Sequence, residues 1–177
     1  MNALSDEIRE GTNPLERFFS PRSIAIVGLS RAALEGPNSV FNTLKNFGFS
    51  GDIHIVNPSI PAASAQNVHA SICDLPEPVE VAIVVVARHR VVQVLQDCIK
   101  TGIKAAIVIT QGFADADEEG ARLQEEIVRL TRENDLRVLG PNTIGLSNAF
   151  SNFTSSFIEM HNAKLPIGLI SQSGLFM

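Results

Sequence analysis

The stretch Ser23-Ile-Ala-Ile-Val-Gly28 is a short run of β-branched and small apolar residues that ends at a glycine. A strand that is apolar at every position, and not only at alternate positions, is typical of a parallel sheet covered on both faces. Apolar residues at helical spacing follow over residues 38–47, and Gly48 ends that helix. The segment therefore predicts the first strand and helix of a βαβ unit.

The same alternation recurs along the rest of the chain. Further buried strands are expected over residues 52–56, 81–86, 104–109 and 136–139, and amphipathic helices over 91–99 and 117–134. Residues 59–78 carry weak signals, with a short helix or a minor strand near Val68. Strands that alternate with long helices imply parallel pairing and right-handed crossovers. We therefore expect an α/β fold with a doubly wound parallel sheet.

Composition excludes several classes of protein. The 177 residues are 45% apolar, which suits one globular domain, and 14 basic against 19 acidic residues give a net charge of −5. An acidic chain is a poor partner for nucleic acid or an anionic membrane. The longest apolar run, residues 81–87, is far short of the roughly 18 residues that suggest a membrane span. Two cysteines, Cys73 and Cys98, and a polar N-terminus without a signal-peptide pattern point to the cytoplasm.

The C-terminal residues depart from this rhythm. Residues 147–166 hold no clear helix, whereas Pro166-Ile-Gly-Leu-Ile170 resembles another buried strand, and Ser171-Gln-Ser-Gly174 resembles a turn into a helix. We expect a lead-in over residues 1–20, the α/β domain over 21–150, and a linker with the first strand of a truncated second domain over 151–177. The alternative is an edge strand added to the same sheet.

Ligands of doubly wound sheets bind beyond the carboxyl ends of the strands. In the first such loop, Ser30 stands where a dinucleotide fingerprint has its second glycine, and Asn57 stands where an NAD site has an acidic residue. Both departures disfavour a nicotinamide cofactor. The loop still offers backbone N–H groups and the Ser30 hydroxyl to a phosphate. An ordinary strand-to-helix connection is the alternative.

Other candidate chemistry is sparse. Arg88-His89-Arg90 places cations at the start of a helix, where an anion would offset their unfavourable interaction with the helix dipole; a solvated charge run is the alternative. His69 and Cys73 are four residues apart, as on one face of a helix, but no third ligand follows, so we expect no metal site. His54 lies within a predicted strand and is expected to be structural. No residue is nominated as catalytic.

The loops taken together resemble a known family. The stretch Leu15-Glu-Arg-Phe-Phe-Ser-Pro-Arg-Ser-Ile-Ala-Ile-Val-Gly-Leu-Ser30 resembles the opening of NDP-forming acyl-CoA synthetases, which include ADP-forming acetyl-CoA synthetase and are related to the succinyl-CoA synthetase alpha subunit. The other motifs, in the family's order, are Val56-Asn-Pro58, Asp74-Leu-Pro-Glu-Pro78, Ile109-Thr-Gln-Gly-Phe-Ala114, Gly140-Pro-Asn142 and Ile170-Ser-Gln-Ser-Gly174. The resemblance spans residues 15–177.

This resemblance implies that residues 21–150 form a Rossmann-like CoA-binding domain and that the tail begins a flavodoxin-like ligase domain. The first loop would hold CoA phosphates, the second the nucleotide portion, the next two would lie along the cofactor, and the last near its thiol. The expected contact residues are Gly28, Leu29, Ser30, Arg31, Val56, Asn57, Pro58, Ser59, Val86, Ala87, Arg88, Ile109, Thr110, Gln111, Gly112 and Asn142.

Two departures from the family's pattern concern charge. The family often has lysine directly after Asn-Pro, where this chain has Ser59, and it usually has a neutral Val-Pro turn where residues 87–90 stand. We hypothesise that Arg88 and Arg90 replace the missing lysine, so that their joint loss weakens CoA binding more than dephospho-CoA binding.

The family's phosphorylated histidine and ATP-grasp module lie in parts for which 177 residues leave no room. The resemblance therefore implies a CoA-binding domain that is not catalytically competent alone. Its partners would be the remaining ligase and ATP-grasp domains or subunit, with a second copy of the chain left open. The alternatives are a stand-alone NAD(P)-binding Rossmann oxidoreductase and a degenerate domain for assembly or regulation that binds no nucleotide.

Overall fold

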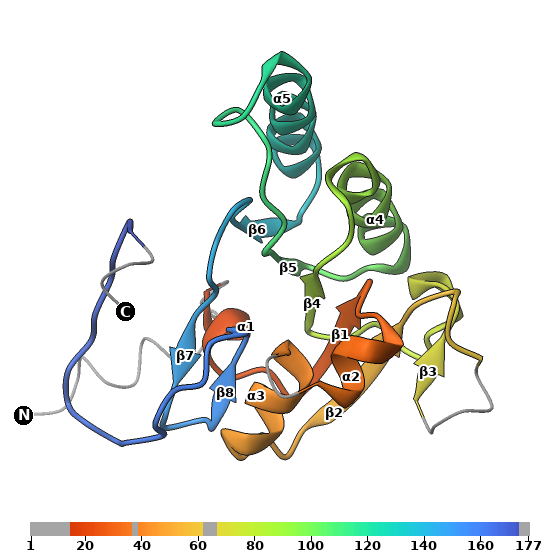
Figure 1. Ribbon diagram of the computed structural model, residues 1–177. Helices are drawn as coiled ribbons and strands as arrows, with labels where there is room; N and C mark the ends of the chain where they lie inside the picture. Colours follow the sequence, from red (N-terminus) through yellow and green to blue (C-terminus); the bar gives the residue numbers. More distant parts are fainter. Residues whose placement is uncertain (1–14, 37–38, 62–66, 174–177) are drawn as a thin grey trace, which may run out of the picture.

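A computed structural model describes residues 15–36, 39–61 and 67–173 of the chain. Six parallel strands form one sheet in the order β3-β2-β1-β4-β5-β6 (Figure 1). The strands are β1 (Ser23–Val27), β2 (Asp52–Val56), β3 (Val68–His69), β4 (Val81–Val84), β5 (Ala105–Val108) and β6 (Arg137–Leu139). Strand order reverses between β1 and β4, which is the point where doubly wound sheets bind ligands. The predicted doubly wound parallel sheet is confirmed.

Helices cover both faces of the sheet. They are α1 (Glu16–Phe19), α2 (Arg31–Glu35), α3 (Val40–Asn46), the 3₁₀-helix η3 (Ile72–Asp74), α4 (Arg88–Thr101) and α5 (Glu118–Glu133). The buried residues of α4 and α5 pack on one face, and those of α3 pack on the other (Figure 1). The central strands β4 and β5 are buried at every position, as their apolar sequences predict.

The helix predictions differ from the structure mainly at helix starts. The helix expected over 91–99 begins at Arg88, and the helix expected from residue 38 is α3, which begins at Val40 after the N-cap Ser39. Residues 37–38 lie outside the described residues. The short helix α2 was not predicted, because five residues carry too little apolar periodicity. Its signal is Ser30, whose side chain caps the helix by accepting a hydrogen bond from Ala33 N at 3.2 Å.

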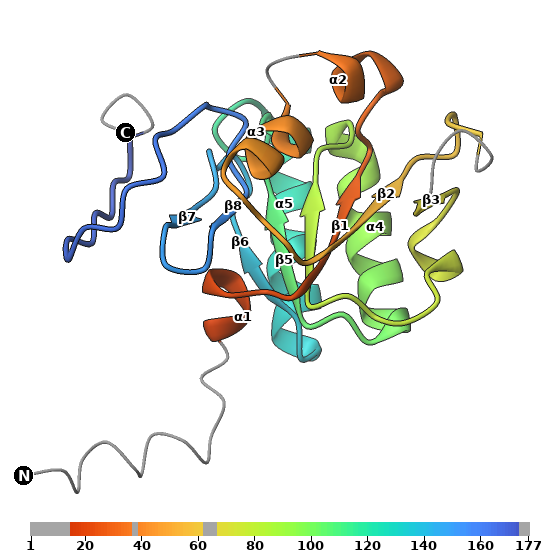
Figure 2. The ribbon, with the colours of Figure 1, turned by 90° about the horizontal axis from the view of Figure 1, so that it is seen from below.

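A hairpin of β7 (Ser147–Asn148) and β8 (Phe153–Thr154) follows the sheet. Phe153 is fully buried in the same core cluster as α3, and both views place β8 beside that helix (Figure 1, Figure 2). Thr43 of α3 donates its hydroxyl hydrogen to the backbone carbonyl of Ser156. The chain from Phe153 to Ser156 therefore packs against the domain that the sequence predicts over residues 21–150.

The two ends of the chain test the strand expected over residues 166–170 and the lead-in expected over residues 1–20. Residues 166–170, predicted as a strand, form none, and Ile170 is fully exposed. They do not join the sheet, so the alternative of an added edge strand is wrong. Phe18 of the lead-in is buried against the domain, whereas residues 1–14 and Gly174 lie outside the described residues. No helix in the described ranges is both long and apolar enough to cross a membrane.

Candidate functional site

The loop after β1 begins at Gly28, which lies against the end of β4. Its backbone N–H donates to Val56 O at 2.9 Å, and its φ is +95°. A Cβ at this position would lie 2.5 Å from Val86 Cγ1. Both the left-handed backbone and the close approach require glycine, so the chain ends of β1, β2 and β4 meet without an intervening side chain.

Asn57, at the end of β2, shapes the two neighbouring loops. Its side-chain Nδ2 donates to the backbone carbonyl of Leu29 at 2.8 Å, and its Oδ1 accepts from the backbone N–H of Ser59 at 2.8 Å. An aspartate could accept from Ser59 but could not donate to Leu29. The geometry therefore explains why this position carries an amide and not the carboxylate of an NAD site.

Two hollows flank the end of β4 and share Val85, Val86 and Ala87. The first, of ≈ 240 Å³, lies on the β1–β2 side and is called the Asn57 hollow; its polar lining residues include Asn57, Ser59, Ser71, Arg90 and Asp97. The second, of ≈ 560 Å³, lies on the β5 side and is called the Thr110 hollow; it is lined by Arg88, Ile109, Thr110, Gln111, Asn142 and Phe157, among others. Together they extend across the switch point of the sheet.

Arg88, the first residue of α4, joins that helix to the start of α5. Its Nη1 donates to Asp117 Oδ2 at 2.7 Å and to the carbonyl of Gly112 at 3.0 Å, and its Nη2 donates to Glu119 Oε2 at 2.7 Å. The hydrogen bond to Asp117 raises the pKa of Arg88. A hydrogen bond from Gly120 N, and then the one from Arg88, lower the pKa of Asp117. The Arg88 charge is thus balanced within the protein.

Main-chain and side-chain hydrogen bonds join the loops that line the Thr110 hollow. Thr110 Oγ1 donates to Val86 O at 2.7 Å, and Asn142 N donates to Thr110 O at 2.9 Å. Asn142 Nδ2 donates to Asp115 Oδ2 at 3.0 Å. The peptide bond between Gly140 and Pro141 is cis. The loops after β4, β5 and β6 are therefore tied to one another.

Most of the predicted contact residues meet at these hollows. The Asn57 hollow gathers Gly28, Val56, Asn57, Pro58, Ser59, Val86 and Ala87, and the Thr110 hollow gathers Val86, Ala87, Arg88, Ile109, Thr110, Gln111 and Asn142. Four predicted residues line neither hollow. Leu29 is buried in the core, Ser30 caps α2, Arg31 pairs with Glu35 at 3.3 Å, and Gly112 accepts from Arg88.

Sequence reasoning missed several lining residues. Ser71 precedes η3 in a region with weak signals, and Phe157 follows the hairpin, so neither carried a local pattern. Asp97 lies on α4, two turns beyond Arg90, and the helical spacing of these two residues was the one signal that could have placed both at the same hollow.

The histidines and the cysteine considered as metal ligands or structural residues lie on β2, β3 and η3. His54 on β2 lies with its Nδ1 3.0 Å from Nε2 of His69 on β3, and burial, then the charge of His69, lower the pKa of His54. Cys73 belongs to η3, so His69 and Cys73 do not share a helix face as their spacing suggested. No group of three metal-ligating side chains occurs among the residues that the structure describes.

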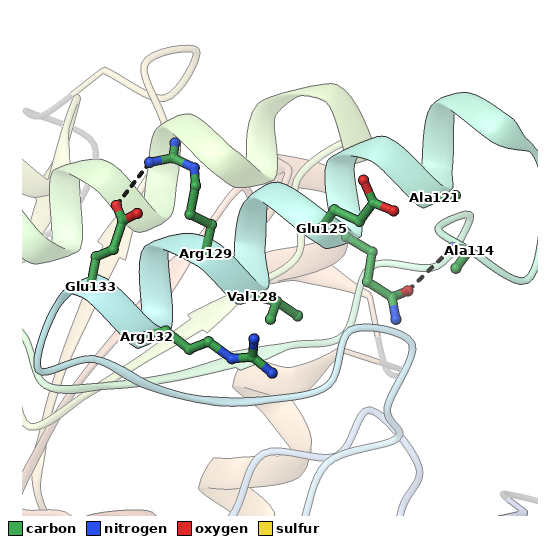
Figure 3. A pocket seen from close by; sticks show the side chains of 8 residues that line it. Ala114, Ala121, Glu125, Val128, Arg129, Arg132 and Glu133 are labelled. Carbon is green, nitrogen blue, oxygen red and sulfur yellow. Dashed lines mark hydrogen bonds and ion pairs between the residues drawn. The ribbon is translucent and has the colours of Figure 1, made fainter.

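Two other hollows lie away from this edge. One, of ≈ 470 Å³, runs along the exposed face of α5 between Gln124, Val128, Arg129 and Arg132 (Figure 3). The other, of ≈ 590 Å³, lies at the opposite edge of the sheet, beside the ion pair of Arg22 and Glu80. Neither is lined by a predicted contact residue, so the switch point is the better candidate site.

Comparison with known proteins gives consistent results. Residues 22–149 match the family described as "CoA binding domain". Over 165 residues the chain is 36% identical to an ADP-forming acetate–CoA ligase II of Archaeoglobus fulgidus, covering 92% of this chain and 24% of that protein. It is 34% identical to the alpha subunit of an ADP-forming acetate–CoA ligase II of Pyrococcus furiosus, covering 90% of this chain and 35% of that subunit.

A solved structure supports the same relationship. The acetyl-coenzyme A synthetase 1 of Ca. Korarchaeum cryptofilum, solved in complex with phosphate and ADP, superposes with a TM-score of 0.70 at 33% identity. The match covers 81% of this chain and 30% of that one. The chain thus spans well under half the length of these three relatives.

Proposed function

The chain belongs to the CoA-binding domain family of ADP-forming acyl-CoA synthetases, and from this premise we propose that its two hollows bind coenzyme A. The observation that carries the proposal is that the Asn57 and Thr110 hollows share the end of β4. An extended ligand with a nucleotide at one end and a thiol at the other needs such a paired site. The Asn57 hollow lies between the ends of β1 and β4, and the Thr110 hollow continues from the end of β4 towards the loops after β5 and β6.

The chemistry of each hollow suits a different part of the ligand. The Asn57 hollow combines the Arg90 guanidinium with the hydroxyls of Ser59 and Ser71, which are donors to phosphate oxygens. The Thr110 hollow has the apolar side chains of Ile109 and Phe157 beside polar groups, which suits the pantetheine arm. We therefore propose that the nucleotide lies in the Asn57 hollow and that the arm crosses Val86 and Ala87.

Asn57 counts against the second candidate, an NAD(P)-dependent oxidoreductase. A nicotinamide dinucleotide site places a carboxylate at this position to accept from ribose hydroxyls. Here the Asn57 side chain is held by Leu29 O and Ser59 N. The same two bonds fix the loops after β1 and β2 beside the Asn57 hollow, and this fixed hollow favours binding over a degenerate domain that binds no nucleotide.

Within a complete ligase, this domain would present CoA to an acyl group activated elsewhere. The CoA sulfur would form the thioester C–S bond as the acyl–phosphate C–O bond breaks, with phosphate leaving and the thiol proton passing to water. The acyl phosphate would come from the remaining ligase and ATP-grasp parts, so the domain would not be competent alone.

Cys73 and Cys98 are both free, which is consistent with a reducing cytoplasm.

Calorimetric titration with CoA, acetyl-CoA, NADH and ADP tests the proposal. We expect heat of binding with CoA and acetyl-CoA and none with NADH. Binding of NADH alone would support the oxidoreductase, and no binding of any ligand would support the degenerate domain. Protein concentration should be set by amino-acid analysis, because the chain has no Trp and no Tyr.

A further inference from the structure

The two arginines in the first turn of α4 have different surroundings. Arg88 donates to Asp117, Glu119 and the carbonyl of Gly112, and only 28% of its side chain is exposed. Its guanidinium charge is therefore matched by two carboxylates. The bonds hold the end of the loop after β5 against α4, so Arg88 acts on the Thr110 hollow by fixing its wall.

Arg90 has no such partner. It is exposed and forms no ion pair within residues 15–36, 39–61 and 67–173. It lines the Asn57 hollow, where the exposed Ser59 supplies a hydroxyl but no charge. Asp97 is the one carboxylate residue that also lines this hollow, and it makes no ion pair with Arg90 in the described chain.

The positive charge of the Arg90 guanidinium lies in the first turn of α4 without a neighbouring carboxylate to neutralise it among the ion pairs of the described residues. A cation in the first turn of a helix interacts unfavourably with the helix dipole. A bound anion would remove this cost for Arg90, as Asp117 and Glu119 do for Arg88. A phosphate monoester is the anion that suits it best, since it carries a charge of about −1.5 to −2 at pH 7 and accepts two hydrogen bonds from the guanidinium fork.

We infer that Arg90, and not Arg88, contacts the 3′-phosphate of CoA and makes this chain prefer CoA to dephospho-CoA. The inference rests on the proposed function and narrows the hypothesis that both arginines replace a missing lysine. The 3′-phosphate is the phosphate monoester of the nucleotide portion. Each phosphate of the diphosphate bridge instead carries one ester bond and one anhydride bond. Arg88 is a positioning residue for the pantetheine side of the site.

The experiment compares CoA and dephospho-CoA affinities of four proteins by calorimetry: the unmodified chain, Arg90→Gln, Arg88→Ala and Lys100→Ala. Lys100→Ala is the matched control, since it removes an exposed cation from the same helix at its other end. We expect the unmodified chain and Lys100→Ala to prefer CoA by about tenfold, as one charged hydrogen-bond pair supplies. Arg90→Gln should lose this preference without weaker dephospho-CoA binding. Arg88→Ala should weaken both ligands by the same factor.

Contrary outcomes separate the inference from the proposed function. An Arg90→Gln chain that keeps the preference, or that loses affinity equally for both ligands, overturns the inference while CoA binding stands. Loss of the preference in Arg88→Ala also overturns it. Failure of the unmodified chain to bind either ligand overturns the proposed function itself. Arg90→Gln keeps the Cβ and Cγ methylene groups of an exposed side chain, so its melting temperature should match that of the unmodified chain.

Discussion

The side-chain amide nitrogen of Asn57 lies 2.8 Å from the carbonyl oxygen of Leu29, so one hydrogen bond joins the end of β2 to the loop after β1. Asn57→Asp replaces this donor with an acceptor that faces the same carbonyl. We expect the free energy of unfolding to fall by about 1–3 kcal/mol, as for a half-buried polar group that loses its partner. Urea unfolding followed by far-ultraviolet circular dichroism measures this loss.

Asn57→Ala separates the lost bond from the added charge. It removes both side-chain hydrogen bonds of Asn57 but leaves the Asn57 hollow without a new carboxylate. We expect CoA to bind more weakly to Asn57→Asp than to Asn57→Ala, because the carboxylate repels phosphate. Equal affinities of the two variants would show that the hollow does not hold an anionic group.

Gly28→Ala should disturb the loops through the close approach of β1 to β4. The added Cβ would lie 2.5 Å from Val86 Cγ1, at a φ of +95° that an L-residue rarely adopts. We expect a loss of about 2–4 kcal/mol, combining backbone strain with overpacking. Chemical denaturation measures the loss. Gly168→Ala is the matched control, since nothing lies within 4 Å of its added Cβ, and it should leave stability unchanged.

The sheet was predictable because its signal is local. The unbroken apolar runs of β4 and β5 identify strands buried on both faces, and their alternation with helices fixes the parallel topology. The candidate site followed from this topology, since the carboxyl ends of parallel strands share one edge. The residue type at position 57 was also informative, because an NAD site has an acidic residue where this chain has Asn57.

The errors concern features that depend on distant contacts. The two-residue strands of the β7–β8 hairpin are too short for any periodicity. Residues 166–170 are apolar enough for a buried strand, but a strand also needs a hydrogen-bonded neighbour, which the pattern does not supply. The partners of Arg88 are 29 and 31 residues away in sequence. Its balanced charge could therefore not be distinguished from the unmatched charge of Arg90.

The two cysteines should differ in reactivity. Cys73 is exposed, whereas Cys98 is buried, and this burial raises the pKa of the Cys98 thiol to about 12. Because the thiolate is the reactive form, iodoacetamide near neutral pH should modify Cys73 and spare Cys98. Peptide mass spectrometry identifies the modified residue. In urea both should react, and modification of Cys98 then reports unfolding. Modification of Cys98 in the native chain at the rate of Cys73 would contradict its burial.

The contact between His54 and His69 should make stability depend on pH. Their ring nitrogens lie 3.0 Å apart, so one ring donates and the other accepts, and a pair with both rings protonated loses this bond. Burial, followed by the charge of His69, lowers the pKa of His54, while the charge of Asp52 opposes the shift. The unfolded chain, with a histidine pKa of about 6.5, therefore binds this proton at higher pH than the folded chain.

It follows that the contribution of His54 is fully present above about pH 6.5 and falls as the pH drops from there towards the lowered pKa of the folded state. We expect the unmodified chain to lose more stability than His54→Gln between about pH 7.5 and about pH 5.5, a range above the ordinary carboxylate pKa values. Urea midpoints at the two pH values measure the difference. The Gln side chain can still donate to His69 but does not titrate, so an equal loss in both proteins would mean that another group controls the pH dependence.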